Sequence, residues 1–205
     1  MLEFVESLES RRLLSTVTLA AAGASLASDA GALIADAKPA KVALIAAAKT
    51  FKTDVQSLHL KTGAMKSALM NDIASARTKI QADVSHVISA GLKDGQNVVS
   101  DVLHITLLDA GNSAKIASYQ KDLAVRVKTL QTLETPLVAK LTSDVGNAIT
   151  QVNGAVHAIV TANSADQSLQ TDWTQLSRAF QSAETTLIPD LTNVIADLNA
   201  LSTAT

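Results

Sequence analysis

Apolar residues recur along most of the chain at intervals of three and four, the spacing of an α-helix that buries one face. The pattern predicts helices over about 40–61, 64–91 and 97–109. Three longer stripes follow, from Ile116 to Leu133, from Leu137 to Ile159 and from Leu169 to Leu198. No run of alternating β-branched or aromatic residues between turn signals indicates a strand.

Short joints separate these predicted helices. Thr62-Gly63 interrupts the first pair, "KDGQN" at 93–97 has the Asp-Gly step of a turn, and "AGNS" at 110–113 combines a terminating glycine with capping residues. Ser164 and Gln167 have the spacing of a capping box before the last helix. Long one-faced helices with short joints predict an all-α fold, an elongated up-and-down bundle of five or six helices.

Two prolines fall inside the long stripes. Thr135-Pro136 is typical of an N-cap followed by a proline at the first helical position, so the sequence favours a helix break there over a kink in one long helix. Pro189 is expected to kink the last helix, because proline removes a backbone hydrogen bond and crowds the preceding turn.

Composition supports helices and excludes some chemistry. Hydrophobic residues make up 47% of the 205 positions and aromatic residues 2%, with 8 glycines and 3 prolines, so an alanine-rich aliphatic core is expected. The only tryptophan, Trp173, lies on an apolar stripe and is predicted to be a core aromatic residue. The absence of cysteine excludes disulfides, thiolate metal sites and cysteine catalysis.

Charge is distributed unevenly along the chain, although the net charge is only −2. Residues 1–37 have net charge −3, residues 38–140 have +6, and residues 141–205 have −5. The basic middle and the acidic end would neutralise each other if the last helix packed along residues 40–60 or 113–133. Overall negative charge and the lack of aromatic residues among the basic ones argue against a nucleic-acid partner.

The first part of the chain has features of an export signal. Arg11 and Arg12 precede sixteen uncharged residues, and a small-x-small sequence ends at Ala27. That run is too short and too weakly apolar for a helix of about 20 residues that spans a bilayer. We therefore predict a targeting segment over residues 1–27, which cleavage would remove, and one bundle domain over residues 28–205. The alternative is that residues 2–36 are simply the first amphipathic helix.

The stretch "LESRRLLS" explains why three glutamates accompany those arginines. It resembles the LEPR-XLL motif at the N-termini of many exported or surface proteins of planctomycetes and related bacteria, and Ser10 stands where the motif has proline. The resemblance implies export or sorting to the cell envelope, to the surface or the periplasm, and it implies no activity. The matching positions are Leu8, Glu9, Arg11, Leu13 and Leu14.

A row of lysines is the most distinctive surface feature that the pattern predicts. Lys38, Lys41, Lys49 and Lys52 project onto one side of the helix beside its apolar stripe. Basic amphipathic helices can bind anionic membranes or polymers, whereas the simpler interpretation is a solvated flank whose lysine stems cover apolar surface.

Two Asp-x-x-His sequences are the best candidates for a metal site. Asp83 with His86 and Asp101 with His104 each place a carboxylate and an imidazole on one helix face, a spacing that di-metal bundles use with glutamate. Helical projection turns both histidines away from the apolar stripes, towards water. We therefore predict no metal, no cofactor and no catalytic centre, and the chain lacks a nucleophile elbow and a phosphate-binding glycine loop.

Two functional hypotheses remain after these exclusions. The first is a non-enzymatic helical scaffold or binding protein of the bacterial cell envelope, alone or as an oligomer, whose partner is a protein or an envelope polymer. The alternative is a membrane-active bundle, similar to pore formers, that docks through the lysine row.

Overall fold

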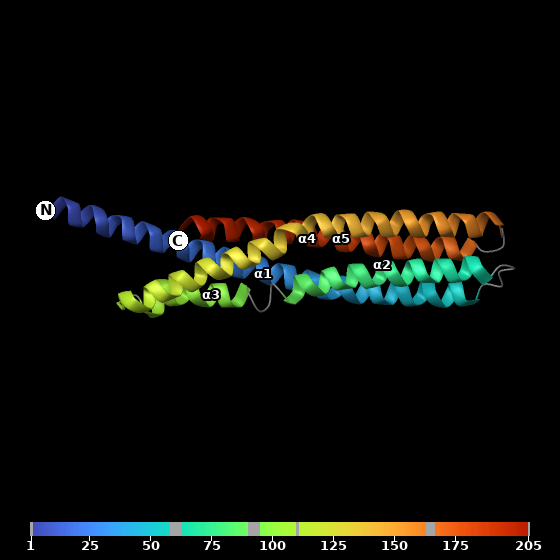
Figure 1. The fold of residues 1–205 in the computed structure, drawn as a ribbon, viewed down its shortest axis with the longest axis horizontal. Coiled ribbons are helices and arrows are strands. Elements are labelled where there is room, and N and C mark those ends of the chain that lie inside the picture. Colours follow the sequence, from blue (N-terminus) through green and yellow to red (C-terminus); the bar gives the residue numbers. More distant parts are fainter. Residues whose placement is uncertain (1, 58–62, 90–94, 110, 163–166, 205) are drawn as a thin grey trace. The chain divides into compact units, whose positions relative to one another are not determined.

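The chain is helical throughout the part that the computed structural model describes. That part comprises residues 2–57, 63–89, 95–109, 111–162 and 167–204, with side chains from Val17 in the first range and from Ser168 in the last. The predicted all-α helical bundle is confirmed, and no strand occurs among these residues (Figure 1). The helices are α1 (Leu2–Ser57), α2 (Gly63–Ser89), α3 (Gln96–Leu103), the π-helical turn η2 (His104–Leu108), α4 (Ser113–Ala162) and α5 (Gln167–Ala204).

The helices form two compact units. Unit 1 contains residues 1–34, 88–136 and 189–205, and unit 2 contains residues 35–87 and 137–188. The helices α1, α4 and α5 contribute to both units, whereas α3 and η2 belong to unit 1 alone. Within unit 2, four helical segments run alternately up and down, as the short joints predict (Figure 1).

Each of the three long helices continues through a proline. Pro39 lies inside α1, Pro136 inside α4 and Pro189 inside α5. The predicted break at Pro136 is therefore wrong, and α1 is one helix where the pattern indicated a separate start near residue 40. An interior proline costs a helix about 3 kcal/mol. The buried Leu130 and Leu137 on either side of Pro136 supply packing that outweighs this cost.

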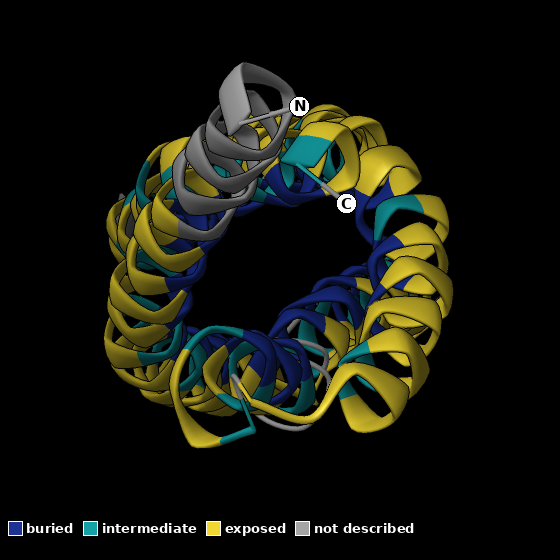
Figure 2. Ribbon diagram, turned by 90° about the vertical axis from the view of Figure 1, so that its left-hand side faces the viewer, coloured by how far each residue is buried: buried dark blue, intermediate teal, exposed yellow. Residues whose placement is uncertain are grey.

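The predicted apolar stripes form the core of each unit. Buried positions follow one side of every helix, and exposed positions follow the other (Figure 2). Trp173 is buried as expected, its ring centroid lies 6.0 Å from that of Phe51, and its Nε1–H donates to Asn153 Oδ1 at 3.0 Å. This arrangement joins α1, α4 and α5 in unit 2, because each of the three residues comes from a different helix.

At a few positions the buried residue is the sequence neighbour of the one that the apolar spacing predicted. Leu133 was expected in the core, yet it is 39% exposed, and Glu134 occupies the buried position with 1% exposure. Ile149 and Ile195 are half-buried, and their neighbours Ala148 and Val194 are buried instead. A regular spacing of three and four drifts by about 20° per heptad from an ideal helix, which is enough to exchange adjacent positions.

Part of the predicted targeting segment is packed in unit 1. Leu19, Ala22 and Leu26 are buried, and α1 passes residue 27 without interruption. Cleavage of the chain after Ala27 stays a prediction. Cleavage there would remove three buried side chains from unit 1.

A glycine lets α1 and α3 approach closely in unit 1. A Cβ atom added at Gly23 would lie 2.6 Å from Val102 Cγ1, closer than any real Cβ contact. Gly31, two turns further along α1, has no atom within 4 Å of the same position. The backbone of α1 therefore touches α3 at Gly23, and only glycine fits there.

One helix in the described part is long and apolar enough to cross a membrane. Within Val17–Ser57, an 18-residue window reaches a mean hydropathy of 1.5, and 33% of that window is buried in the protein. The prediction that the apolar run is too short to span a bilayer counted only the sixteen uncharged residues after Arg12. The longer continuous helix passes the test by length and composition, as do signal sequences and buried core helices.

The connection from η2 to α4 is tightly hydrogen-bonded. Asn112 Oδ1 accepts a hydrogen bond from the backbone N–H of Lys115, so Asn112 caps α4 as the "AGNS" sequence predicts. Asp109 Oδ2 lies 3.1 Å from His104 Nδ1, and its Oδ1 accepts from Lys115 Nζ at 3.0 Å. The His104 ring stacks on Tyr119 with centroids 4.5 Å apart. The other predicted capping pair, Ser164 and Gln167, lies outside the described side chains.

Candidate binding surface

The lysine row forms one flank of α1 in unit 2. Leu44, Ala48, Phe51 and Val55 anchor the helix, because all four are buried in the core of the unit. This anchoring fixes the rotation of α1 about its own axis, so the lysine flank is turned outwards. Lys38, Lys49 and Lys52 are exposed, and Lys41 is half-buried.

Two exposed aliphatic residues lie among the lysines. Val42 is 66% exposed and Ile45 is 37% exposed. Their helical positions place Ile45 within the row and Val42 at its edge. We call Lys38, Val42, Ile45, Lys49 and Lys52 the basic face of α1. The lysines of this face were predicted from the sequence, whereas Val42 and Ile45 were not, although the same helical projection places them there.

The lysines of the basic face have no ion-pair partner among the described residues. Lys41 Nζ donates to Ser85 Oγ of α2 at 3.1 Å, which holds this lysine against unit 2 and sets it apart from the others. In the described part of the chain, the ammonium groups of Lys38, Lys49 and Lys52 form neither an ion pair nor a hydrogen bond. Three free positive charges therefore surround two exposed apolar side chains.

The acidic last helix does not neutralise these lysines. The helix α5 packs beside α1 in unit 2, one of the two arrangements that would allow neutralisation, and Trp173 contacts Phe51 there. The charges that meet at this contact are alike, because the neighbour of Asp172 is Asp54 of α1. Burial and the nearby Asp54 carboxylate raise the pKa of Asp172 from 3.8 to about 6. Among the described residues, no ion pair joins an acid of α5 to the lysine row.

The Asp54–Asp172 contact predicts a pH effect on stability. Because folding raises the pKa of Asp172, the folded chain binds this proton more tightly, and the contribution to stability falls as the pH rises from 3.8 to about 6. Asp172→Asn removes the repulsion and should raise the free energy of unfolding at pH 7 by about 1 kcal/mol after allowance for solvent screening. Thermal melts should show this gain shrinking towards pH 4.

The matched control for this effect is Asp36→Asn, which changes a half-buried aspartate of α1 in the same unit. The comparison asks whether the pH-dependent gain is specific to Asp172→Asn or accompanies any loss of an aspartate charge in this unit. If Asp172→Asn raised the free energy of unfolding equally at pH 4 and pH 7, the effect would not come from the raised pKa of Asp172.

The aspartate and the histidine of the first Asp-x-x-His sequence do not form one site. Asp83 is buried and accepts a hydrogen bond from Lys140 Nζ, which also donates to Asp144 Oδ2 at 2.7 Å. Burial raises the pKa of Asp83, against the lowering effect of Lys140, whereas the hydrogen bond from Lys140 lowers the pKa of Asp144. His86 is exposed, as the projection predicts. Asp83 therefore belongs to an ion pair between α2 and α4.

The aspartate and the histidine of the second Asp-x-x-His sequence, Asp101 and His104, also have different partners. Asp101 Oδ2 lies 2.9 Å from Arg126 Nε of α4, and burial raises the pKa of Asp101, against the lowering effect of Arg126. His104 is held by Asp109 and Tyr119. Within the described ranges, no group of three or more His, Asp or Glu side chains is placed to hold a metal ion. Sequence reasoning missed both ion pairs, because their partners lie on another helix.

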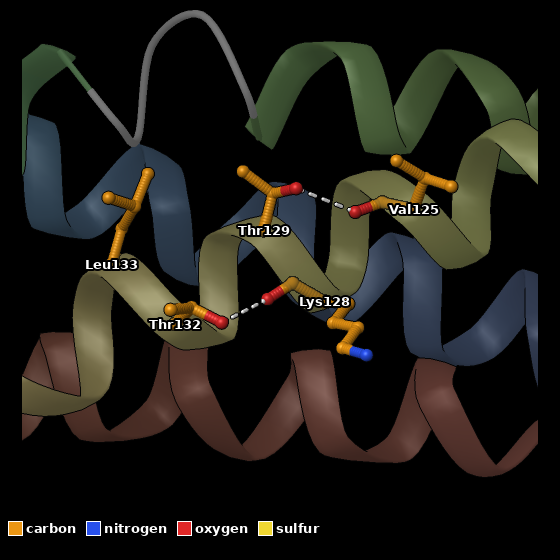
Figure 3. Close-up of a pocket in the computed structure, with 5 residues that line it drawn as sticks. All are labelled: Val125, Lys128, Thr129, Thr132 and Leu133. Atoms are coloured by element: carbon orange, nitrogen blue, oxygen red, sulfur yellow. Dashed lines mark hydrogen bonds between the residues drawn. The ribbon is translucent and has the colours of Figure 1, made fainter.

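Unit 1 also exposes apolar surface. Leu107 and Leu108, at the end of η2, are 70% and 68% exposed. A shallow depression of about 360 Å³ follows the outer side of α4, where the aliphatic groups are flanked by threonines whose hydroxyls bond back to the helix (Figure 3). Its lining consists of Val125, Lys128, Thr129, Thr132 and Leu133.

The residues of the LEPR-XLL-like motif belong to the first turns of α1, and their side chains lie outside the described part. They are Leu8, Glu9, Arg11, Leu13 and Leu14.

No family model matches the chain, and no curated protein and no solved structure is significantly similar to it.

Proposed function

We propose that the chain is a non-enzymatic helical binding protein, or scaffold, of the bacterial cell envelope. The observation that carries this proposal is the basic face of α1. Three unpaired lysines and two exposed aliphatic residues lie on a helix whose opposite side is anchored in the core of unit 2. Such a surface gains both electrostatic and apolar contacts when a partner covers it.

The location in the envelope is supported by the N-terminal sequence. The motif around Leu8–Ser15 resembles the LEPR-XLL motif of exported proteins, and α1 continues it with a long apolar stretch. The buried Leu19 and Leu26 support a variant of the targeting hypothesis in which the segment is retained after export as part of unit 1.

Cell fractionation with intact-mass analysis tests this proposal. We expect the native protein in the envelope fraction, with an N-terminus that precedes Val17. Arg11→Gln combined with Leu13→Ser should shift it to the cytosol, because both positions match the motif. Wild-type protein found only in the cytosol would contradict envelope location, and an N-terminus at Ser28 would contradict retention.

The second candidate is a membrane-active bundle. Exposed Leu107 and Leu108 at the end of η2, and a helix apolar enough to cross a membrane, favour it. This function would require α1 to leave the core, where Leu44 and Phe51 are fully buried. Release of a dye from loaded vesicles distinguishes the two candidates, since a scaffold binds without leakage.

A further inference from the structure

The basic face of α1 has the geometry of a flat contact. Lys38 and Lys52 are separated by fourteen residues of continuous helix, a length of roughly 21 Å. All five members project within an arc of about 80°. One plane can therefore meet three ammonium groups and two aliphatic side chains at the same time, without a change in the fold.

The acids of the same helix lie away from the basic face. The two acids of α1 in unit 2, Asp36 and Asp54, project onto the opposite side of the helix, about 180° from Ile45. Lys41, at the margin of the row, is bound to Ser85. An approaching anionic surface would meet attraction from Lys38, Lys49 and Lys52 and no carboxylate of the same helix.

From this arrangement we propose that the basic face of α1 docks the protein on an anionic lipid surface, an inference that rests on the proposed location in the envelope. Lys38, Lys49 and Lys52 contact phosphate groups of the lipid, and Val42 and Ile45 enter the boundary with the acyl chains. The long stems of the lysines let their charges stay at the headgroups while the aliphatic residues lie deeper.

The aliphatic residues favour lipid over other anionic partners. A soluble anionic polymer offers no apolar phase to Val42, which is 66% exposed, or to Ile45. A protein partner is usually held by aromatic or arginine anchors, and lysine is depleted at protein interfaces. The basic face contains no aromatic residue and no arginine. Lysines around aliphatic side chains are typical of helices that lie in a lipid interface.

Co-sedimentation of the full-length protein with vesicles tests the proposal. Vesicles of equal parts phosphatidylglycerol and phosphatidylcholine should bind it at low salt, and pure phosphatidylcholine vesicles should not. Replacing Lys38, Lys49 and Lys52 by Gln should lower the partition coefficient roughly a hundredfold, about fivefold for each charge. Val42→Ser with Ile45→Ser should lower it by about tenfold with all charges kept.

The matched control replaces three other exposed lysines, Lys79, Lys121 and Lys128, by Gln. This variant has the same net charge as the triple variant of the basic face, and its partition coefficient should change by less than about threefold, because none of these lysines belongs to the basic face of α1. Far-ultraviolet circular dichroism should show the same helical content for all variants.

Three results would overturn the inference. Equal losses for the two lysine triples would indicate diffuse charge rather than a docking face. Unchanged binding after substitution of Val42 and Ile45, together with displacement of vesicles by polyphosphate, would indicate a polymer partner. Dye release at the binding concentration would indicate the membrane-active bundle. Wild-type protein in the envelope together with failed vesicle binding would leave the proposed function standing and refute only the lipid docking.

Discussion

Gly23→Ala will destabilise unit 1, although alanine is the better helix former. The added Cβ atom would lie 2.6 Å from Val102 Cγ1, and the β-branched valine has little rotational freedom to move aside. Overpacking of this kind costs about 1–3 kcal/mol, which exceeds the gain of up to about 1 kcal/mol from helix propensity. For a chain of this size, a net loss of 1–2 kcal/mol corresponds to a melting temperature lower by roughly 2–8 °C.

The chain contains its own control and its own probes for this experiment. Gly31→Ala has no atom within 4 Å of the new Cβ and should stabilise the protein by about 0.5–1 kcal/mol. The only tyrosine, Tyr119, reports on unit 1, and the only tryptophan, Trp173, reports on unit 2. Loss of the Tyr119 signal should shift to lower temperature more than loss of the Trp173 signal.

A second substitution checks the assigned cause. Val102→Ala in the Gly23→Ala background should restore part of the lost stability, because it removes the atom that the new Cβ meets. If Gly23→Ala stabilised the protein as much as Gly31→Ala does, the close contact between α1 and α3 would be refuted.

Local patterns predicted the helices and most of the core, because one face of each helix is buried. The stripe from Leu44 to Val55 and the burial of Trp173 follow directly from apolar spacing. The cap at Asn112 follows from residue type. Helix continuity through Pro136 did not follow, since it depends on packing by other helices, which a local pattern does not contain.

The spacing of apolar residues did not predict the polar residues in the core. Glu134 occupies a buried position that a glutamate would not be expected to take, so the stripe was assigned to Leu133. Asp83 and Asp101 were considered as metal ligands, whereas each contacts a cation of α4. Such pairs join residues far apart in the sequence, and no spacing rule within one helix reveals them.

The candidate surface was predictable in part. The lysine row came from the sequence alone, since helical projection depends only on residue number. Only the packed structure shows that Lys41 donates a hydrogen bond to Ser85. It also shows that the ammonium groups of Lys38, Lys49 and Lys52 form no ion pair among the described residues. At the lysine row the described part of the acidic last helix supplies no neutralising partner, because α5 presents Asp172 to Asp54 there.

Removal of residues 1–27 will strongly destabilise unit 1. Leu19 and Leu26 are buried in that unit, and a fully buried leucine contributes about 1.5–3 kcal/mol. The truncation also removes Gly23, where α1 touches α3. A chain that begins at Ser28 should therefore lose about 4 kcal/mol or more of unfolding free energy. Denaturant titrations that follow Tyr119 should show the loss, with a smaller change at Trp173.

Point substitutions in the full-length chain separate lost packing from lost chain length. Leu19→Ala with Leu26→Ala should reproduce most of the effect, whereas Val17→Ala, at a position 67% exposed on the same helix, should stay within about 0.5 kcal/mol of the wild type. If the chain from Ser28 unfolded at the same midpoint as the full-length protein, residue 27 would be a true domain boundary. A large loss instead means that cleavage after Ala27 would leave a weakened unit 1, which favours export with α1 retained.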